Sequence, residues 1–481
     1  MNLGLKTGLL GTAAALAIAV TSVPAYAQDD LSALRQQLET MKERLAKLEA
    51  DKAQKRRVAA AAAVEAGDKP RSWKLPGTNT SMNIGGFVKM SAIWDFSQSG
   101  QGSSSTTTEG IGAGFYPTPG SAADNIHNGG SFQFTARRSR FWIQTWTPTD
   151  WGELRTYIEA DFAGSGATAG SSTNLLRLRQ AFGTLGPVLA GKTQTLFGGF
   201  IGLPELLHDG APYAPAALRI EQIRYSHNFG GGLVFNIALE SGATTSDAGV
   251  TGNSHDVVGM TTAGATVTGF PGPQRWPDVV ASVQWNFPNG GLYVAGMIGQ
   301  RDIDSGGPSG VAGLARNDNA IVWGASVGAR YSFGRVEIGG QGAIGSGIGN
   351  KYLDGGATGF VDTVAVLNTA SNATSLNPVL GYFMQGYVQV KLTDTIRATG
   401  VYGWGMHEVI SEGTGTKGAI KTALSPTGAL PQGYWAAFGN LLWNPVPQVT
   451  LGAEYSFQHS ARYNGADVQA HRLQFAAIYR F

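Results

Sequence analysis

Cysteine is absent from the 481-residue sequence, so no disulfide can stabilise this chain. Charged residues are scarce, at 14%, and the formal net charge of +2 indicates no acidic or nucleic-acid partner. After the first 27 residues there is no run of about 18 apolar residues, the length that a membrane-spanning helix needs. These absences argue against a disulfide scaffold, a nucleic-acid-binding protein and a bundle of membrane-spanning helices.

Residues 1–27 are predicted to be a secretory signal peptide. Lys6 precedes the apolar stretch GLLGTAAALAIAV, and Ala25 and Ala27 in PAYAQDD form an Ala-x-Ala cleavage site. The alternative is an N-terminal membrane anchor, for which the apolar stretch is short. We expect an exported protein whose mature chain begins near Gln28.

Residues 28–57 carry a heptad pattern. Apolar residues spaced 3-4-3-4-3 form its seam: Leu31, Leu34, Leu38, Met41, Leu45 and Leu48. The seam covers only about three heptads, so the predicted coiled coil needs chains that are already held together. The alternative is an amphipathic helix packed on its own domain. Residues 58–80, interrupted by Gly67, Pro70 and Pro76, are predicted to be a linker.

From residue 81 onward the apolar period changes to two. In SMNIGGFVKMSAIWDF the even positions are almost all apolar, whereas the odd ones include Asn83, Lys89 and Asp95. The same alternation recurs near 153–162, 233–240, 278–287 and 472–481. Glycine, at 69 residues, and aromatic residues, at 10%, suit many strands joined by turns. The apolar face belongs either in the core of a soluble sandwich or against lipid.

The connections between strands favour the membrane. Short turns are expected near 147–150, 186–187, 230–232, 288–290, 334, 393–395 and 444–447. They alternate with long loops near 97–130, 164–173, 198–217, 242–276, 301–318, 346–378, 407–431 and 460–467. One rim of tight turns and one of long loops is typical of bacterial outer-membrane barrels. Residues 81–481 are therefore predicted to form an all-β, 16-stranded antiparallel transmembrane β-barrel in a Gram-negative outer membrane.

The sequence ends in FAAIYRF, with an aromatic residue as its last position. The last strand must pair with the first, because a closed barrel leaves no backbone amide unpaired in lipid. Phe481 is then expected on the lipid face beside Tyr479, in the interfacial aromatic girdle.

The lumen of a 16-stranded barrel holds water. The cations predicted to face it are Lys89, Arg138, Arg140, Arg155, Arg177, Arg179, Lys192 and Arg224. Glu153, Glu159 and Asp161 share strands two to six with seven of these cations, so some guanidiniums are expected to lack a protein partner. Such a wall favours anions, although lumen arginines can simply pair with carboxylates. Arg137 does not fit: it would face lipid, lie in a subunit interface or mark a bulge.

The mature chain resembles the DcaP-like trimeric outer-membrane porins. The resemblance rests on the heptad region, WKLPGTNTSMNIGGFVKMSAIWDF, FTARRSRFWIQTWTPTDWGELRTYIEADF, LLRLRQAFGTLGPVLAGKTQTLFG and HRLQFAAIYRF. It implies a homotrimer in outer-membrane lipid with a periplasmic coiled coil, and passive diffusion of small anionic solutes such as dicarboxylates. It also implies that the assembly machinery recognises Phe481. The long loops near 242–276 and 346–378 depart from the family.

In trimeric porins the third loop folds inward and narrows the pore. The third long loop here, FGGFIGLPELLHDGAPYAPAALR, is stiffened by Pro204, Pro212 and Pro215. We therefore expect a constriction loop that carries Glu205, His208 and Asp209. The alternative is an external loop that packs on a neighbour.

Enzyme motifs are not convincing. GTGTKG at 413–418 matches a dinucleotide-binding pattern but has no strand before it and no helix after it. The pair His407 and Glu408 lacks a second histidine at metal-binding spacing. We expect no catalysis, cofactor or metal. Two functions remain: a porin with a preference for anions, or a structural or adhesive barrel tethered through its coiled coil. The basic lumen favours the porin, and dicarboxylates, aromatic acids, sugar acids and phosphate all suit it.

Overall fold

A computed structural model describes most of the chain as two compact units, Met1–Glu65 and Ala66–Phe481. The described residues are 26–61, 65–97, 131–164, 175–199, 201–208, 219–241, 257–261, 266–267, 275–303, 318–354, 362–368, 373–408, 431–462 and 467–481. The predicted signal peptide lies almost wholly outside them.

In the first unit a single helix, α1 (Tyr26–Ala61), replaces the slightly shorter helix predicted over 28–57. Its seam side chains Leu34, Leu38, Met41, Leu45 and Leu48 are 55–67% exposed. An exposed apolar stripe at heptad spacing is what a coiled coil would bury. Among the described residues, no helix is long and apolar enough to cross a membrane.

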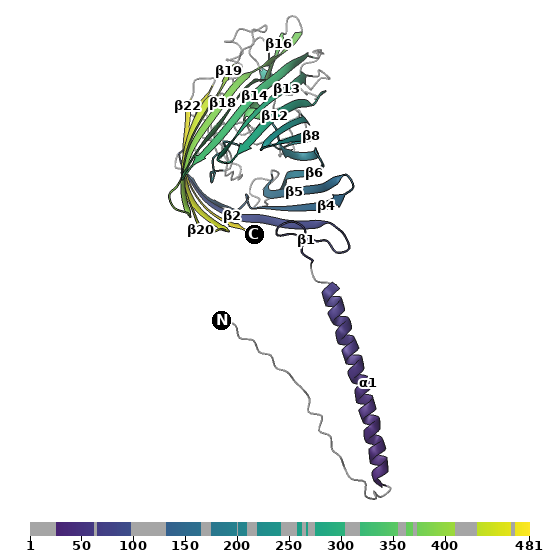
Figure 1. The fold of residues 1–481 in the computed structure, drawn as a ribbon. Coiled ribbons are helices and arrows are strands. Elements are labelled where there is room, and N and C mark those ends of the chain that lie inside the picture. The colour runs from purple at the N-terminus through teal and green to yellow at the C-terminus, as the bar shows by residue number, and fades with distance from the viewer. Residues whose placement is uncertain are drawn as a thin grey trace. The chain divides into compact units, whose positions relative to one another are not determined.

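The second unit is a closed antiparallel barrel (Figure 1). Its strands are β2 (Ser81–Ser97), β3 (Ser131–Thr135), β4 (Arg140–Thr149), β5 (Gly152–Gly164), β6 (Leu175–Leu185), β7 (Val188–Gln194), β8 (Arg219–Gly230), β9 (Leu233–Glu240), β12 (Asp278–Phe287), β13 (Gly290–Ile303), β14 (Asp318–Phe333), β15 (Val336–Ser346), β18 (Leu380–Lys391), β19 (Ile396–Glu408), β20 (Pro431–Val446), β21 (Val449–Arg462) and β22 (Asp467–Arg480). β3 and β4 both pair with β2 and together count as one interrupted strand of the wall. The described strands therefore form a sixteen-stranded barrel, as predicted.

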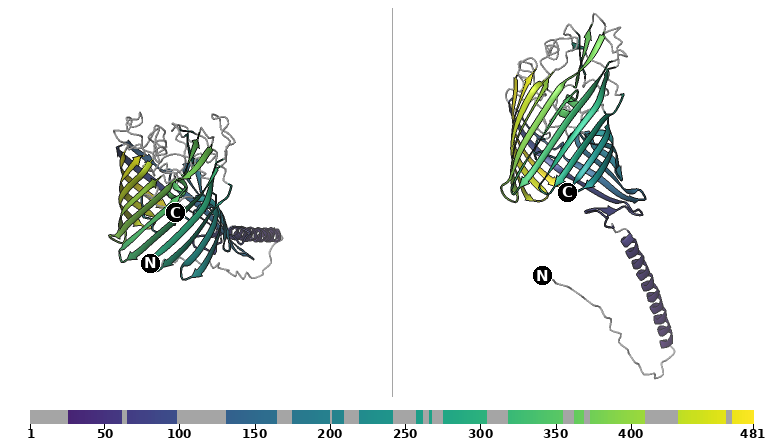
Figure 2. Two further views of the ribbon diagram at one scale, coloured as in Figure 1. Left: turned by 90° about the horizontal axis from the view of Figure 1, so that it is seen from above. Right: turned by 45° about the horizontal axis from the view of Figure 1, so that its top comes forward.

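Additional strands lie outside the barrel wall. A two-residue strand, β1 (Trp73–Lys74), pairs with β2, so the barrel unit includes part of the predicted linker 58–80. The predicted loops near 242–276 and 346–378 contribute β10 (Val257–Thr261), β11 (Thr266–Val267), β16 (Thr363–Asn368) and β17 (Ala373–Pro378) to a separate four-stranded sheet. This sheet belongs to the long-loop rim (Figure 2).

The short connections lie where they were predicted, between β4 and β5, β6 and β7, β8 and β9, β12 and β13, β14 and β15, β18 and β19, and β20 and β21. Gly186 and Gly334 hold φ angles of +56° and +61° in two of these turns. Glycine reaches this left-handed region without the steric cost of a Cβ atom, which explains its use there.

Side-chain exposure follows the predicted alternation on β2. Val88 and Trp94 are about half exposed on the outer face, whereas Ser91 and Asp95 are buried on the inner face. The barrel closes between β22 and β2, where Phe481 donates its amide to Gly86 O at 3.1 Å and Gly86 donates to Phe481 O at 3.3 Å. A Cβ atom at Gly86 would lie 2.5 Å from the backbone oxygen of Arg140 and 2.6 Å from the Phe481 ring, so glycine suits the close approach of the strands here.

Between β3 and β4 the wall contains one extra residue. Ser91 pairs with Thr135 and Phe87 pairs with Arg140, so residues 136–139 lie opposite residues 88–90. Arg137 lies in this interruption and donates to the carbonyl of Gly164 at 2.9 Å. Of the three placements considered for Arg137, the bulge explains its departure from the alternation.

Candidate functional site

Asp161 on β5 forms ion pairs with three guanidiniums, two from β6 and one from the residues before β4. Arg177 on β6 binds it with both Nε (2.9 Å) and Nη2 (2.6 Å), and Arg179 binds it through Nη1 at 2.7 Å. Arg138, from the interruption before β4, approaches the same carboxylate at 3.9 Å. Asp161 is fully buried by these contacts.

Glu159, two residues earlier on the same face of β5, repeats the arrangement. Arg179 Nε donates to its carboxylate at 2.9 Å, Arg140 on β4 lies 3.4 Å away, and Tyr157 Oη donates at 2.9 Å. We call Arg138, Arg140, Arg177 and Arg179 the arginine cluster.

The arginine cluster contradicts one prediction. The expectation that some guanidiniums lack a protein partner is wrong for these four, because all reach a carboxylate. Within the described residues, the four guanidiniums gather around the carboxylates of Glu159 and Asp161. The sequence could not show that these two acids on β5 would each bind arginines from both sides.

The remaining predicted inward cations also have partners. Arg155 donates to Gln144 at 3.3 Å and lies over the rings of Tyr157 and Phe182. Arg224 donates to Gln222 at 2.9 Å and to the carbonyl of Gln194 at 2.5 Å. Buried Lys89 donates to the carbonyl of Leu207 at 2.8 Å.

The predicted inward position of Lys192 is wrong. Lys192 on β7 lies opposite Glu221 on β8, and the next pair on the same face contains Ile223, which is 61% exposed on the outer wall. Its ammonium lies 3.4 Å from the Glu221 carboxylate, which is also outside.

A bulge on β6 is the physical reason for this error. Leu178 pairs with Ala160 and Gln180 pairs with Glu159, so Arg179 is an extra residue. The extra residue shifts the in–out alternation by one. Alternation counted from the inward side chain of Arg177 therefore assigns the residues of β7 to the wrong faces.

The described residues of the loop after β7 run inside the barrel along its wall. Near the start, the amide of Leu196 and the hydroxyl of Thr195 donate to Glu240 on β9, at 2.8 and 2.7 Å. Further along, Gly199 packs on Tyr293 of β13, and Gly202 packs on the backbone of β15. We call residues 195–199 and 201–208 the belt.

The far end of the belt docks on β19 and β21. Glu205 forms a bidentate ion pair with Arg397 on β19. Glu454 on β21 accepts the amides of Leu207 and His208, each at 2.8 Å. Asp209, the third acidic or basic residue predicted for this loop, lies outside the described residues.

A second segment also enters the barrel, and the sequence analysis missed it. After β15 the chain forms a π-helical turn, η2 (Gly349–Asp354), whose side chains Tyr352 and Leu353 are buried. Tyr352 packs on the belt residue Phe197 with ring centroids 5.3 Å apart. The apolar residues of GIGNKYL within a loop otherwise rich in glycine and threonine were the available signal.

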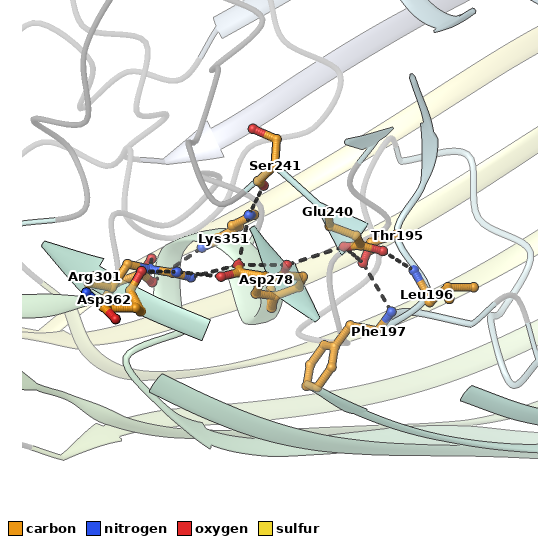
Figure 3. Close-up of polar contacts among 11 residues, drawn as sticks. Thr195, Leu196, Phe197, Glu240, Ser241, Asp278, Arg301, Lys351 and Asp362 are labelled. Atoms are coloured by element: carbon orange, nitrogen blue, oxygen red, sulfur yellow. Dashed lines mark hydrogen bonds and ion pairs between the residues drawn. The ribbon is translucent and has the colours of Figure 1, made fainter. Parts of the chain in front are cut away.

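A polar network holds η2 in place (Figure 3). Lys351 Nζ lies 3.1 Å from Asp278 on β12, which also binds Arg301 on β13 at 2.8 Å. Tyr352 Oη donates to Asp278 at 2.9 Å and lies 3.3 Å from the Glu240 carboxylate. Complete burial lowers the pKa of the Lys351 ammonium, whereas the Asp278 carboxylate opposes this shift. Because Glu240 contacts both Thr195 of the belt and Tyr352 of η2, it connects the belt to η2.

Comparisons with known proteins fit this geometry. A family model described as a porin subfamily matches residues 73–475. The crystal structure of the outer membrane channel DcaP of Acinetobacter baumannii matches with a TM-score of 0.63 at 20% identity, over 87% of this chain and 100% of that chain. No curated protein sequence matches the chain.

Two further solved structures match at lower similarity. Outer-membrane expressed OmpT of Vibrio cholerae matches with a TM-score of 0.46 at 10% identity, over 85% of this chain and 99% of that chain. An anion-selective porin from Comamonas acidovorans matches with a TM-score of 0.44 at 10% identity, over 84% of this chain and 100% of that chain.

The family model and the DcaP structure confirm the family resemblance that was inferred from the sequence. The family model covers most of the chain, and the DcaP match shares the closed sixteen-stranded fold. This protein therefore belongs to the porin subfamily and is an outer-membrane channel.

Proposed function

We propose that this channel conducts small anionic organic solutes past the arginine cluster. The observation that carries the proposal is the gathering of four guanidiniums around Glu159 and Asp161 on one stretch of the barrel wall. Guanidinium groups bind carboxylates through paired hydrogen bonds, and a pore wall lined by cations concentrates anions. The belt, with Glu205 and His208, is proposed to narrow the passage that these solutes use.

Reversal potentials of the purified protein in a planar bilayer under a KCl gradient test this proposal. The wild-type channel is expected to pass chloride in preference to potassium. Replacing Arg138 and Arg140 together by Gln keeps hydrogen bonding, removes two charges and is expected to lower that preference. Arg335→Gln, at an exposed turn beside Asp394, is the matched control. A reversal potential that is equal in all three proteins would overturn the proposal.

We propose dicarboxylates as the preferred solutes. A dicarboxylate reaches two guanidiniums of the arginine cluster at once, whereas a monocarboxylate reaches one. Each charge-assisted contact contributes at most about 1.5–3 kcal/mol, and lumen water lowers that figure. The resulting occupancy is brief enough for release on the far side.

Solute block of the chloride current tests the dicarboxylate proposal. Succinate and phthalate are expected to interrupt the current more than acetate and benzoate at equal concentration. Raising the salt to 1 M, where screening acts over about 3 Å, should weaken the block. Equal block by mono- and dicarboxylates, with no effect of salt, would leave a general anion filter.

We also propose that the protein is a homotrimer in outer-membrane lipid, with residues 28–57 forming a periplasmic coiled coil. The exposed seam of α1 supports this, because each copy presents the same apolar stripe and identical helices bury it mutually. Phe481, which occupies the closing seam of the barrel, is proposed to be the residue that the assembly machinery recognises.

A further inference from the structure

The inner face of the wall carries fully buried apolar side chains between β12 and β18. Val280 on β12, Val322 on β14 and Phe383 on β18 are at most 3% exposed. They belong to one cluster of buried apolar residues that also contains Phe197 of the belt and Tyr352 of η2. The lumen of an outer-membrane barrel is normally lined by polar side chains in contact with water. This part of the lumen is instead packed like a protein core.

Three neighbouring strands are shaped to receive η2 and the residue before it. Gly324, Gly345 and Gly381 lie side by side on β14, β15 and β18. A Cβ atom at Gly324 or Gly345 would lie 2.4 or 2.3 Å from Cδ1 of Ile348, and one at Gly381 would lie 2.8 Å from Cδ1 of Leu353. Ile348 and Leu353 are themselves fully buried, so neither has free space to move into. Glycine in this row therefore fits the inward position of η2.

Polar contacts fix the same segment at its entry and at its centre. Gly347 donates its amide to the carbonyl of Val379, just before β18, at 2.9 Å. Lys351 is fully buried and pairs with Asp278 on β12 at 3.1 Å (Figure 3). A buried ion pair holds its geometry strongly, because moving one partner away leaves the other charge uncompensated. The apolar packing, the glycine row and the ion pair thus all fix η2 inside the barrel.

We propose that η2 is a second segment that narrows the channel. With the first part of the belt, it fills the lumen beside β12 to β18. Solutes then pass on the side of β4 to β6, where Arg155, Tyr157 and Phe182 point inward and stay partly exposed. Without the six residues of η2, water would reach the wall at Val322 and the passage would be wider. The inference rests on the channel function alone and does not depend on the proposed preference for anions.

Thiol accessibility tests the proposal directly, because the chain has no native cysteine and each introduced thiol is unique. Val322→Cys lies against the start of the inward segment, since a Cβ atom at Gly347 would lie 2.2 Å from Cγ1 of Val322. Thr184→Cys, opposite Arg155 on the inner wall of β6, is the matched control on the proposed path. The purified full-length channel in vesicles is treated with a neutral methanethiosulfonate reagent, and the rise in protein mass is followed over time.

We expect Val322→Cys to react at least about tenfold more slowly than Thr184→Cys, because a buried thiol reacts only during local opening. Replacing Gly349–Asp354 by six alternating glycine and serine residues should bring the two rates together. It should also increase the single-channel conductance severalfold and admit larger neutral sugars in vesicle-swelling assays. Tyr352→Ala, a milder change that removes the contact with Phe197, should shift both readouts in the same direction.

Heat-modifiable migration on gels confirms that each variant is folded. Equal reaction rates of Val322→Cys and Thr184→Cys in the otherwise unchanged channel would overturn the proposal, because this part of the lumen would then be wet. Unchanged conductance and sugar size limit in both η2 variants would overturn it as well, because the segment would not narrow the passage. The reagent and the sugars are neutral, so these results are independent of the reversal potentials that test anion preference.

Discussion

At the scale of single residues, two acids set the charge of the arginine cluster. Glu159 and Asp161 lie on one face of β5 and bind arginines from both sides of that strand. They hold the guanidiniums in position but also cancel part of their charge. Under the proposed function, the acids therefore act on selectivity with the opposite sign to the arginines.

We expect Glu159→Gln to increase the preference for chloride, whereas the arginine replacements lower it. The substitution removes one negative charge and keeps one acceptor oxygen for either Arg179 or Tyr157, which donate to different oxygens of Glu159. A charge about 4 Å from the ion path in water changes its energy by about 1 kcal/mol, or the permeability ratio about fivefold. Reversal potentials give this ratio, and Glu153→Gln, at the exposed pair with Lys69, is the control. A shift toward potassium would show that Glu159 does not act through its charge.

At the scale of elements, the interior is shaped by two segments that leave the wall. The belt is attached to β9 at its start and to β19 and β21 at its end. The η2 turn packs on the first part of the belt through Tyr352 and Phe197. Because Glu454 accepts two consecutive belt amides, it is the residue whose loss should release the far end first.

Glu454→Gln is expected to give a larger and noisier single-channel conductance. The amide group retains one acceptor but turns an N–H group toward a belt amide, so one contact worth about 1.5–3 kcal/mol is lost. Single-channel recording in a planar bilayer measures the effect. Glu337→Gln is the control, since Glu337 accepts from Tyr387 and Ser332 rather than from the belt. Traces that match wild type would show that the belt does not limit conductance.

The elements also show where sequence reasoning succeeds. Period-two alternation and turn residues were enough to predict the strands, because lipid and lumen impose opposite chemistry on adjacent residues. Lys192 was misplaced because the bulge at Arg179 is set by the pairing of β5 with β6, which no local pattern shows. The η2 turn was missed because its place depends on contacts with Glu240 and Asp278, more than 70 residues away.

At the scale of the whole molecule, the chain joins two units of different kinds. The barrel unit begins at Ala66, earlier than the predicted start at residue 81, because β1 pairs with β2 and Ala66 forms a β-bridge with Trp73. The helix α1 can therefore be removed without cutting into the barrel. Deleting the residues before this boundary therefore tests the contribution of α1 to assembly separately from that of the barrel.

We expect deletion of residues 28–65 to leave a folded, oligomeric barrel that dissociates at a lower temperature than wild type. The barrel wall remains, but the apolar seam of α1 is lost. Migration on mildly denaturing gels after a temperature series measures dissociation. Leu38→Lys combined with Leu45→Lys places charge in the seam and should reproduce the deletion. If the deleted protein runs as a folded monomer, α1 rather than the barrel holds the copies together.

The seam between β2 and β22 has a consequence for the time course of folding. Phe87 pairs with Arg480, residues that are 393 positions apart (480 − 87). Contacts of such high sequence separation form slowly, because a long loop must be closed before any pairing energy is gained. Until then both edge strands expose unpaired amides, which hydrocarbon does not tolerate. Ring closure at Gly86 and Phe481 is thus expected to be the slow, cooperative step, after which the barrel has no edge from which to unravel.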